Sequence, residues 1–127
     1  MAVVVHGGLT PLAKRVEIRS HQLTVDEDAS VGGADSGPSP HDLLDAALAS
    51  CTALTLSLYA QRKGWPIDNI HVEVTHAESP GLYELTRQIR IDGSLDDEQR
   101  ARLLAVAEKC PIHKALSGQF KIASQLS

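Results

Sequence analysis

Two cysteines are the residues of this chain best suited to redox chemistry. Cys51 lies in the middle of an uncharged stretch that runs from residue 46 to residue 60. Cys110 closes a polar segment and is followed at once by Pro111. A buried cysteine alone is often an inert packing residue, but two thiols that can meet can be oxidised and then reset by a reductant. The pair therefore indicates a redox couple.

A metal site is the competing interpretation of the same thiols. Cys110 and His113 form a Cys-x-x-His half-site, and Cys51 would add a third soft ligand for zinc. Zinc sites normally use four ligands in closely spaced pairs, so we expect neither a bound metal nor a resident cofactor. His41 could act as a base or a ligand, but we interpret it as a surface residue.

The composition narrows the class of protein. A length of 127 residues fits one domain, residues 1–127. The net charge is −4, and the basic residues do not form a long block. Phosphate binding needs a concentrated basic face, and base stacking needs aromatic residues, which make up 3% of this chain, so a nucleic-acid partner is not expected. The first eight residues lack a secretory pattern, so we expect a cytoplasmic protein, where a cysteine pair favours catalysis over a structural disulfide.

The first half of the chain predicts strands followed by one long helix. Apolar residues at 2–5, 16–18 and 23–25 alternate or cluster as in half-buried strands, with a turn near residues 20–22 and a Gly- and Pro-rich loop at 26–40. A helix is expected from about Ser39 to Lys63, with Gly64 as its end. Its uncharged part is shorter than the roughly 20 residues that a bilayer requires, so we expect a protein-buried helix and no membrane partner.

The second half predicts a hairpin, a helix and a last strand. Residues 70–75 and 85–91 alternate around a turn at 79–81, and Asp96 is the expected cap of a helix that ends at about Cys110. Residues 120–123 are expected to form the last strand. The fold class is therefore α+β with antiparallel sheet. A long apolar helix in so small a domain needs cover on every side, which predicts a homodimer.

Several motifs resemble the OsmC/Ohr family, and most closely its OsmC-like branch. The resemblance covers essentially the whole chain in the expected order and rests on the stretches at residues 32–33, 37–40, 43–53, 59–66 and 108–113. It implies an intertwined homodimer in which antiparallel sheets wrap around buried central helices. It also implies a thiol peroxidase that reduces organic hydroperoxides and is reset by an external dithiol or lipoyl-type reductant.

The resemblance also implies the roles of the two thiols. The first cysteine, Cys51, attacks the peroxide, and the second, Cys110, resolves the sulfenic acid as a disulfide. The expected position of Cys110 at the C-terminal end of a helix agrees, because the negative end of the helix dipole disfavours a thiolate there. Leu43, Leu44, Leu54 and Leu58 are expected to form an apolar pocket that favours organic hydroperoxides.

An arginine and a carboxylate assist the first cysteine in this family. Attack needs a thiolate and therefore a nearby cation, for which Arg19 is our candidate and Arg15 the alternative. In the family's peroxidases a glutamate directly follows the proline that opens the central helix, whereas here His41 follows and the acid, Asp42, comes one residue later. Asp42 either orients Arg19 or only complements the helix dipole. This displacement favours the alternative that the protein binds a small ligand without catalysis.

Overall fold

The computed structural model describes residues 2–8 and 10–127. The chain divides into two compact units, residues 1–44 and residues 45–127. Antiparallel sheet and helices are combined within the chain, so the predicted α+β class is confirmed.

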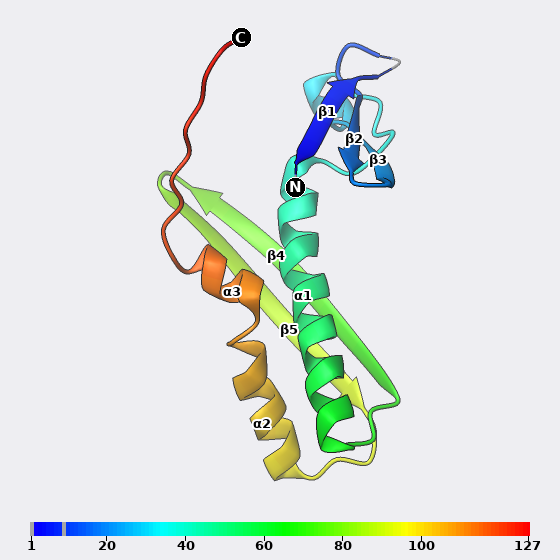
Figure 1. The fold of residues 1–127 in the computed structure, drawn as a ribbon, viewed down its shortest axis with the longest axis vertical. Coiled ribbons are helices and arrows are strands. Elements are labelled where there is room, and N and C mark those ends of the chain that lie inside the picture. The colour runs from blue at the N-terminus through cyan, green and yellow to red at the C-terminus, as the bar shows by residue number, and fades with distance from the viewer. Residues whose placement is uncertain (1, 9) are drawn as a thin grey trace. The chain divides into compact units, whose positions relative to one another are not determined.

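The N-terminal unit contains a three-stranded antiparallel sheet in the order β1-β2-β3 (Figure 1). Its strands are β1 (Val3–Gly7), β2 (Lys14–Ile18) and β3 (His21–Val25). The turn between β2 and β3 lies at residues 19–20, slightly earlier than predicted, because Ile18 pairs directly with His21. Arg19 occupies the first turn position with φ 55°, a left-handed conformation that non-glycine residues seldom adopt.

The loop after β3 is organised by the buried carboxylate of Asp26. Its Oδ2 accepts hydrogen bonds from the backbone N–H of Ala34 at 3.2 Å and of Ser36 at 3.1 Å, and from the Ser36 hydroxyl at 2.7 Å. The Ser36 hydroxyl is the largest cause that lowers the pKa of Asp26 to about 2. A short 3-10 helix, η1 (Ala29–Val31), lies within this loop. The side chain thus replaces the regular backbone pairing that the loop lacks.

One long helix, α1 (Pro40–Lys63), follows the loop. Ser39 and Asp42 form a reciprocal cap, since the backbone N–H of each donates to the side chain of the other at 2.9 and 3.2 Å. The helix ends before Gly64, whose φ of 69° is left-handed. Both predicted ends of this helix are confirmed.

The C-terminal unit packs helices against a long hairpin (Figure 1). The hairpin consists of β4 (Asn69–Ser79) and β5 (Leu82–Asp92), and it is followed by α2 (Asp97–Ala107) and α3 (Pro111–Leu116). Leu56 of α1 and Leu103 and Ala107 of α2 are fully buried at the centre of the core. Half-buried isoleucines of the hairpin pack against them, so the inward side of the hairpin faces α1 and α2.

The predicted last strand is wrong. Residues 119–127 are irregular, and the side chains of Phe120 and Ile122 are 63% and 88% exposed. A strand needs a hydrogen-bonded neighbour, and no strand of the described chain pairs with this segment.

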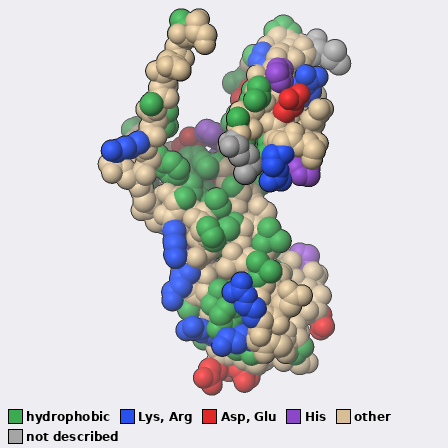
Figure 2. Space-filling model, viewed as in Figure 1, with side chains coloured by type: hydrophobic (Ala, Val, Ile, Leu, Met, Phe, Trp, Pro, Cys, Tyr) green, Lys and Arg blue, Asp and Glu red, His purple; other side chains and the backbone are tan. Residues whose placement is uncertain are grey.

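Much of α1 is uncovered by its own chain. Its length and composition would allow it to span a membrane, and 22% of the apolar 18-residue window that meets this test is buried within the structure. Leu54 and Leu58 are 64% and 53% exposed, and hydrophobic side chains are visible on the face shown in Figure 2. The prediction that a partner subunit covers this helix stays a prediction.

Candidate functional site

Cys110 is fully buried at the start of α3. Its Sγ accepts a hydrogen bond from the backbone N–H of His113 at 3.3 Å, and Pro111 occupies the first turn. The prediction that Cys110 ends the preceding helix is wrong, because α2 ends at Ala107. The cysteine therefore lies at the positive end of a helix, where the dipole favours a thiolate.

Cys51 and Thr52 of α1 lie beside Cys110. The buried stripe of α1 repeats every four residues and consists of Leu48, Thr52, Leu56 and Ala60. The Oγ1 of Thr52 lies 4.0 Å from the Sγ of Cys110. Cys51 is adjacent and partly exposed, with its Sγ 3.9 Å from Thr55 Oγ1. The two cysteines predicted to form a pair are thus neighbours in space.

The surroundings of Cys110 favour its charged form. Burial is the largest influence and raises the pKa of its thiol, but several opposing influences outweigh it. These are, in decreasing order, the hydrogen bond from the His113 backbone, the contacts with the side chains of Cys51 and Thr52, and the charge of Arg87. The pKa of Cys110 is consequently lower than that of an ordinary cysteine, and the thiol of Cys51 contributes directly to this shift.

Arg87 is the cation beside this thiol pair, and it was not predicted from the sequence. It lies on β5, and its guanidinium donates to Thr52 Oγ1 at 3.0 Å and to His113 Nδ1 at 3.0 Å. Its side chain is 10% exposed. Arg87 occupies an inward position of an alternating strand that is otherwise apolar or aromatic on that side. A charged residue at an inward-facing position of such a strand is unusual, and this could have identified Arg87 from the sequence.

His113 and Glu108 complete the polar part of the site. The Nδ1 of His113 faces the guanidinium of Arg87, so this nitrogen accepts and the proton of the neutral ring belongs on Nε2. His113 Nε2 lies 3.4 Å from the Glu108 carboxylate, which is also 3.6 Å from the guanidinium of Arg87. The three side chains therefore hold one another in a closed triangle.

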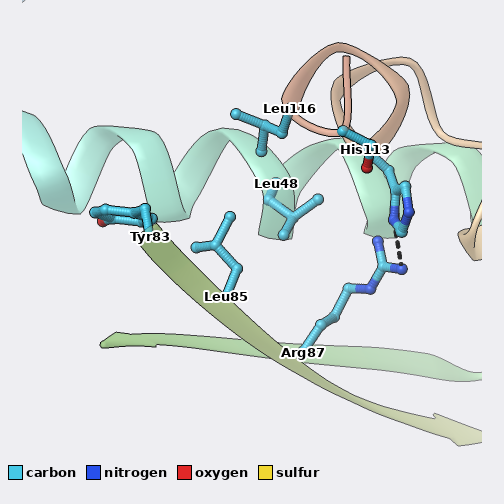
Figure 3. A pocket seen from close by; sticks show the side chains of 7 residues that line it. Leu48, Tyr83, Leu85, Arg87, His113 and Leu116 are labelled. Atoms are coloured by element: carbon cyan, nitrogen blue, oxygen red, sulfur yellow. Dashed lines mark hydrogen bonds between the residues drawn. The ribbon is translucent and has the colours of Figure 1, made fainter. Parts of the chain in front are cut away.

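A cavity of about 220 Å³ opens beside Arg87 and His113 (Figure 3). Leu48, Leu85 and Leu116 form its apolar walls. The leucines predicted to form an apolar pocket, at positions 43, 44, 54 and 58, do not line this cavity, and two of them point outward because the buried stripe of α1 lies on another face. Apolar walls beside a cation and an imidazole suit an amphiphilic organic molecule.

A second polar cluster lies at the Tyr83 end of this cavity. Tyr83 donates a hydrogen bond to Asp45 Oδ1 at 3.0 Å, and Nδ1 of His76 is bonded to the other carboxylate oxygen. The rings of His76 and Tyr83 stack with centroids 4.8 Å apart. These contacts fix Tyr83 in place as one wall of the cavity.

The other predicted site residues lie in the N-terminal unit. Arg19 is at the β2–β3 turn, and Arg15 lies on β2 with its guanidinium 3.6 Å from the Glu17 carboxylate. His41 and Asp42 lie in the first turn of α1, and the Asp42 carboxylate is engaged in the cap with Ser39. The capping contact accounts for an acid at position 42. The proposed roles of Arg19 and Asp42 stay predictions.

Comparison with known proteins relates this chain to a family. The sequence profile described as OsmC-like protein matches residues 32–125, which include both cysteines. No sequence among curated proteins is significantly similar to this chain.

Solved structures share the fold. An OsmC-like protein from Mycoplasma pneumoniae is 21% identical with a TM-score of 0.75, and the match covers 93% of this chain and 89% of that one. An organic hydroperoxide resistance protein, OsmC, from Legionella pneumophila is 24% identical with a TM-score of 0.68, covering 92% and 88%. The organic hydroperoxide resistance protein OhrB of Bacillus subtilis is 25% identical with a TM-score of 0.63, covering 92% and 90%.

Proposed function

Because this chain belongs to the OsmC-like protein family, we propose that it reduces organic hydroperoxides by a two-cysteine mechanism. The observation that carries the proposal is the meeting of Cys51 and Cys110 beside the partly buried Arg87. Cys51 is the attacking thiol, since it is partly exposed while Cys110 is fully buried. The hydroperoxide resistance proteins among the structural neighbours support the substrate class.

The peroxide is reduced in two steps on the protein, and a reductant then restores the two thiols. The Cys51 thiolate attacks one peroxide oxygen, the O–O bond breaks, and the alkoxide leaves and takes up a proton to give an alcohol. Cys51 is then a sulfenic acid. The Cys110 thiolate attacks the Cys51 sulfur, the S–S bond forms, and the S–O bond breaks to release hydroxide, which is protonated to water. A dithiol or lipoyl-type reductant then exchanges its thiols for the disulfide and becomes oxidised.

The N-terminal unit supplies the assisting residues in this proposal. Arg19, from the same chain or from a partner, stabilises the Cys51 thiolate, and Asp42 orients the guanidinium of Arg19.

The uncovered apolar surface of α1 supports a homodimer, because exposed leucines such as Leu54 and Leu58 favour burial. Light scattering at low micromolar concentration tests this, and a monomer there would refute it. We place the protein in the cytoplasm, where reductants keep thiols available.

Thiol titration with intact mass measurement tests the reaction. After one equivalent of cumene hydroperoxide, the protein should lose both thiols and the mass of two hydrogens. Cys110→Ser should instead keep an oxidised Cys51, with a mass increase of one oxygen. If the wild-type protein retains both thiols, the proposal fails. Equal, slow turnover by wild type and Cys51→Ser would also exclude it.

Ligand binding without catalysis is the second candidate. The involvement of the Asp42 carboxylate in a helix cap favours it, because that carboxylate is already occupied. The cavity beside Arg87 could then hold a small amphiphile. Native mass spectrometry of freshly purified protein would reveal a bound molecule, and its absence together with peroxide turnover would exclude this candidate.

A further inference from the structure

Arg87 connects the two segments that carry the thiols. One arm of its guanidinium donates to Thr52, the residue next to Cys51 on α1. The other arm donates to the ring of His113 on α3, whose own backbone N–H donates to Cys110 Sγ. A planar guanidinium holds such pairs of acceptors in a fixed geometry, which the single ammonium of lysine cannot do.

The segment that carries Cys110 is a short connection between two helices. It lies between the end of α2 and the six-residue α3, and the chain beyond α3 is irregular. Glu108, at the start of this segment, also contacts Arg87 at 3.6 Å. The single arginine therefore contacts both flanks of Cys110, through Glu108 and His113, and also α1.

We propose that Arg87 is the positioning residue for disulfide formation, holding Cys110 where its sulfur can attack the oxidised sulfur of Cys51. This inference rests on the proposed function, but the juxtaposition can be tested without a peroxide. When Cys110 attacks, the S–S bond forms and the group on Cys51 leaves. With a sulfenic acid the leaving group is hydroxide, and each sulfur changes by one electron: Cys110 is oxidised and Cys51 is reduced.

Arg87 acts on the second step more than on the first. Its contacts lead to Thr52, His113 and Glu108, and its charge lies beside Cys110. Loss of these contacts frees the Cys110 segment to move away from α1. A displacement of about 1 Å can slow a positioned reaction by about a hundredfold.

A stopped-flow experiment with dithiobis(nitrobenzoate) separates the two steps. Cys51 reacts first and releases one nitrothiobenzoate, and attack of Cys110 on the mixed disulfide releases the second. In Arg87→Met the first release should stay within about threefold of wild type, and the second should slow by about 10- to 100-fold. Arg87→Lys keeps the charge but not the fork, so we expect its second release to remain slow.

Controls make the outcomes decisive. Arg90→Met removes an exposed arginine of the same strand, and both releases should match wild type. Cys110→Ser should give a single release. A second release in Arg87→Met as fast as in wild type, or an equal slowing of both releases, would overturn the proposal.

The peroxide version of the experiment separates the two proposals. With cumene hydroperoxide, Arg87→Met should accumulate a Cys51 sulfenic acid that dimedone captures, whereas wild type proceeds to the disulfide. A wild-type protein that ignores peroxide but shows the two nitrothiobenzoate phases would refute the proposed function and retain the role of Arg87. Thermal unfolding of each variant confirms that the fold is intact.

Discussion

The hydroxyl of Thr52 accepts a hydrogen bond from Arg87 at 3.0 Å and donates one to the Leu48 carbonyl at 2.7 Å. Thr52 is fully buried in the stripe of α1 that is otherwise apolar. A buried polar group is tolerated when its partners are present, and here the hydroxyl satisfies the guanidinium that faces the thiols. The threonine is thus part of the site and not only of the core.

Thr52→Val should destabilise the protein and loosen Arg87. The substitution keeps the shape of the side chain but leaves one guanidinium N–H without its acceptor, which costs about 1–3 kcal/mol in free energy of unfolding. Urea denaturation measures this change. Ser57→Ala, at an exposed position of the same helix, is the matched control and should change stability by less than about 0.5 kcal/mol. Equal stability of Thr52→Val and wild type would contradict the role assigned to this hydroxyl.

Asp26 should make the stability of the N-terminal unit depend on acid. Its pKa is about 2 in the folded state and ordinarily 3.8, so the folded state stabilises the charged form of this carboxyl group. The resulting contribution is complete above the ordinary value and is lost as the pH falls from about 4 to about 2. Asp26→Asn should remove this part of the pH dependence of unfolding.

Unfolding measured between pH 2 and 5 by circular dichroism provides the test for Asp26. Asp35→Asn, at an exposed position of the same loop, serves as the control. We expect the control to retain the acid-dependent loss of stability. If Asp26→Asn and wild type lose stability in parallel over this range, the hydrogen bonds of Asp26 do not contribute to stability.

Local signals in the sequence predicted most elements of the fold. Caps at Ser39 and Asp96, the glycine after Lys63 and the alternation of the hairpin each act over a few residues, and the structure confirms them. The C-terminal segment carries a strand-like pattern, but a strand also needs a neighbour, which local sequence cannot specify.

The site was predicted in part, for a related reason. The cysteines were found from their type and from the surrounding motifs. Arg87 was missed because it stands among strand residues that were interpreted by their hydrophobic alternation alone. The helix that begins after Asp96 is present, but its predicted end at Cys110 was wrong. Only three residues separate α2 from α3, and a proline after the cysteine fits a helix end and a helix start equally well.

The core of the C-terminal unit should depend strongly on Leu56. This side chain is fully buried between α2 and the hairpin, so Leu56→Ala removes apolar contacts and leaves a cavity. We expect a loss of about 2–5 kcal/mol in the free energy of unfolding. Leu104→Ala, at a position of α2 that is 59% exposed, is the control and should cost much less. Similar losses for both variants would contradict this assignment of the core.

Substrate size should be limited by the cavity that Leu116 lines. Leu116→Trp enlarges a side chain that lines the cavity of about 220 Å³ beside Arg87 and His113, and so it reduces the space in that cavity. If the organic group of the peroxide occupies this space, the rate with cumene hydroperoxide should fall by about 10- to 100-fold, a typical cost of a misfit in an apolar pocket. The rate with hydrogen peroxide should change little, because this molecule does not need the space.

Leu82→Trp is the matched control for the cavity, since Leu82 is 53% exposed at the start of β5 and does not line it. The ratio of the two peroxide rates is the informative quantity, because a general loss of folded protein lowers both rates together. A ratio in Leu116→Trp equal to that of wild type would show that the organic group binds elsewhere. The uncovered face of α1, where Leu54 and Leu58 are exposed, would then be the next surface to test by substitution.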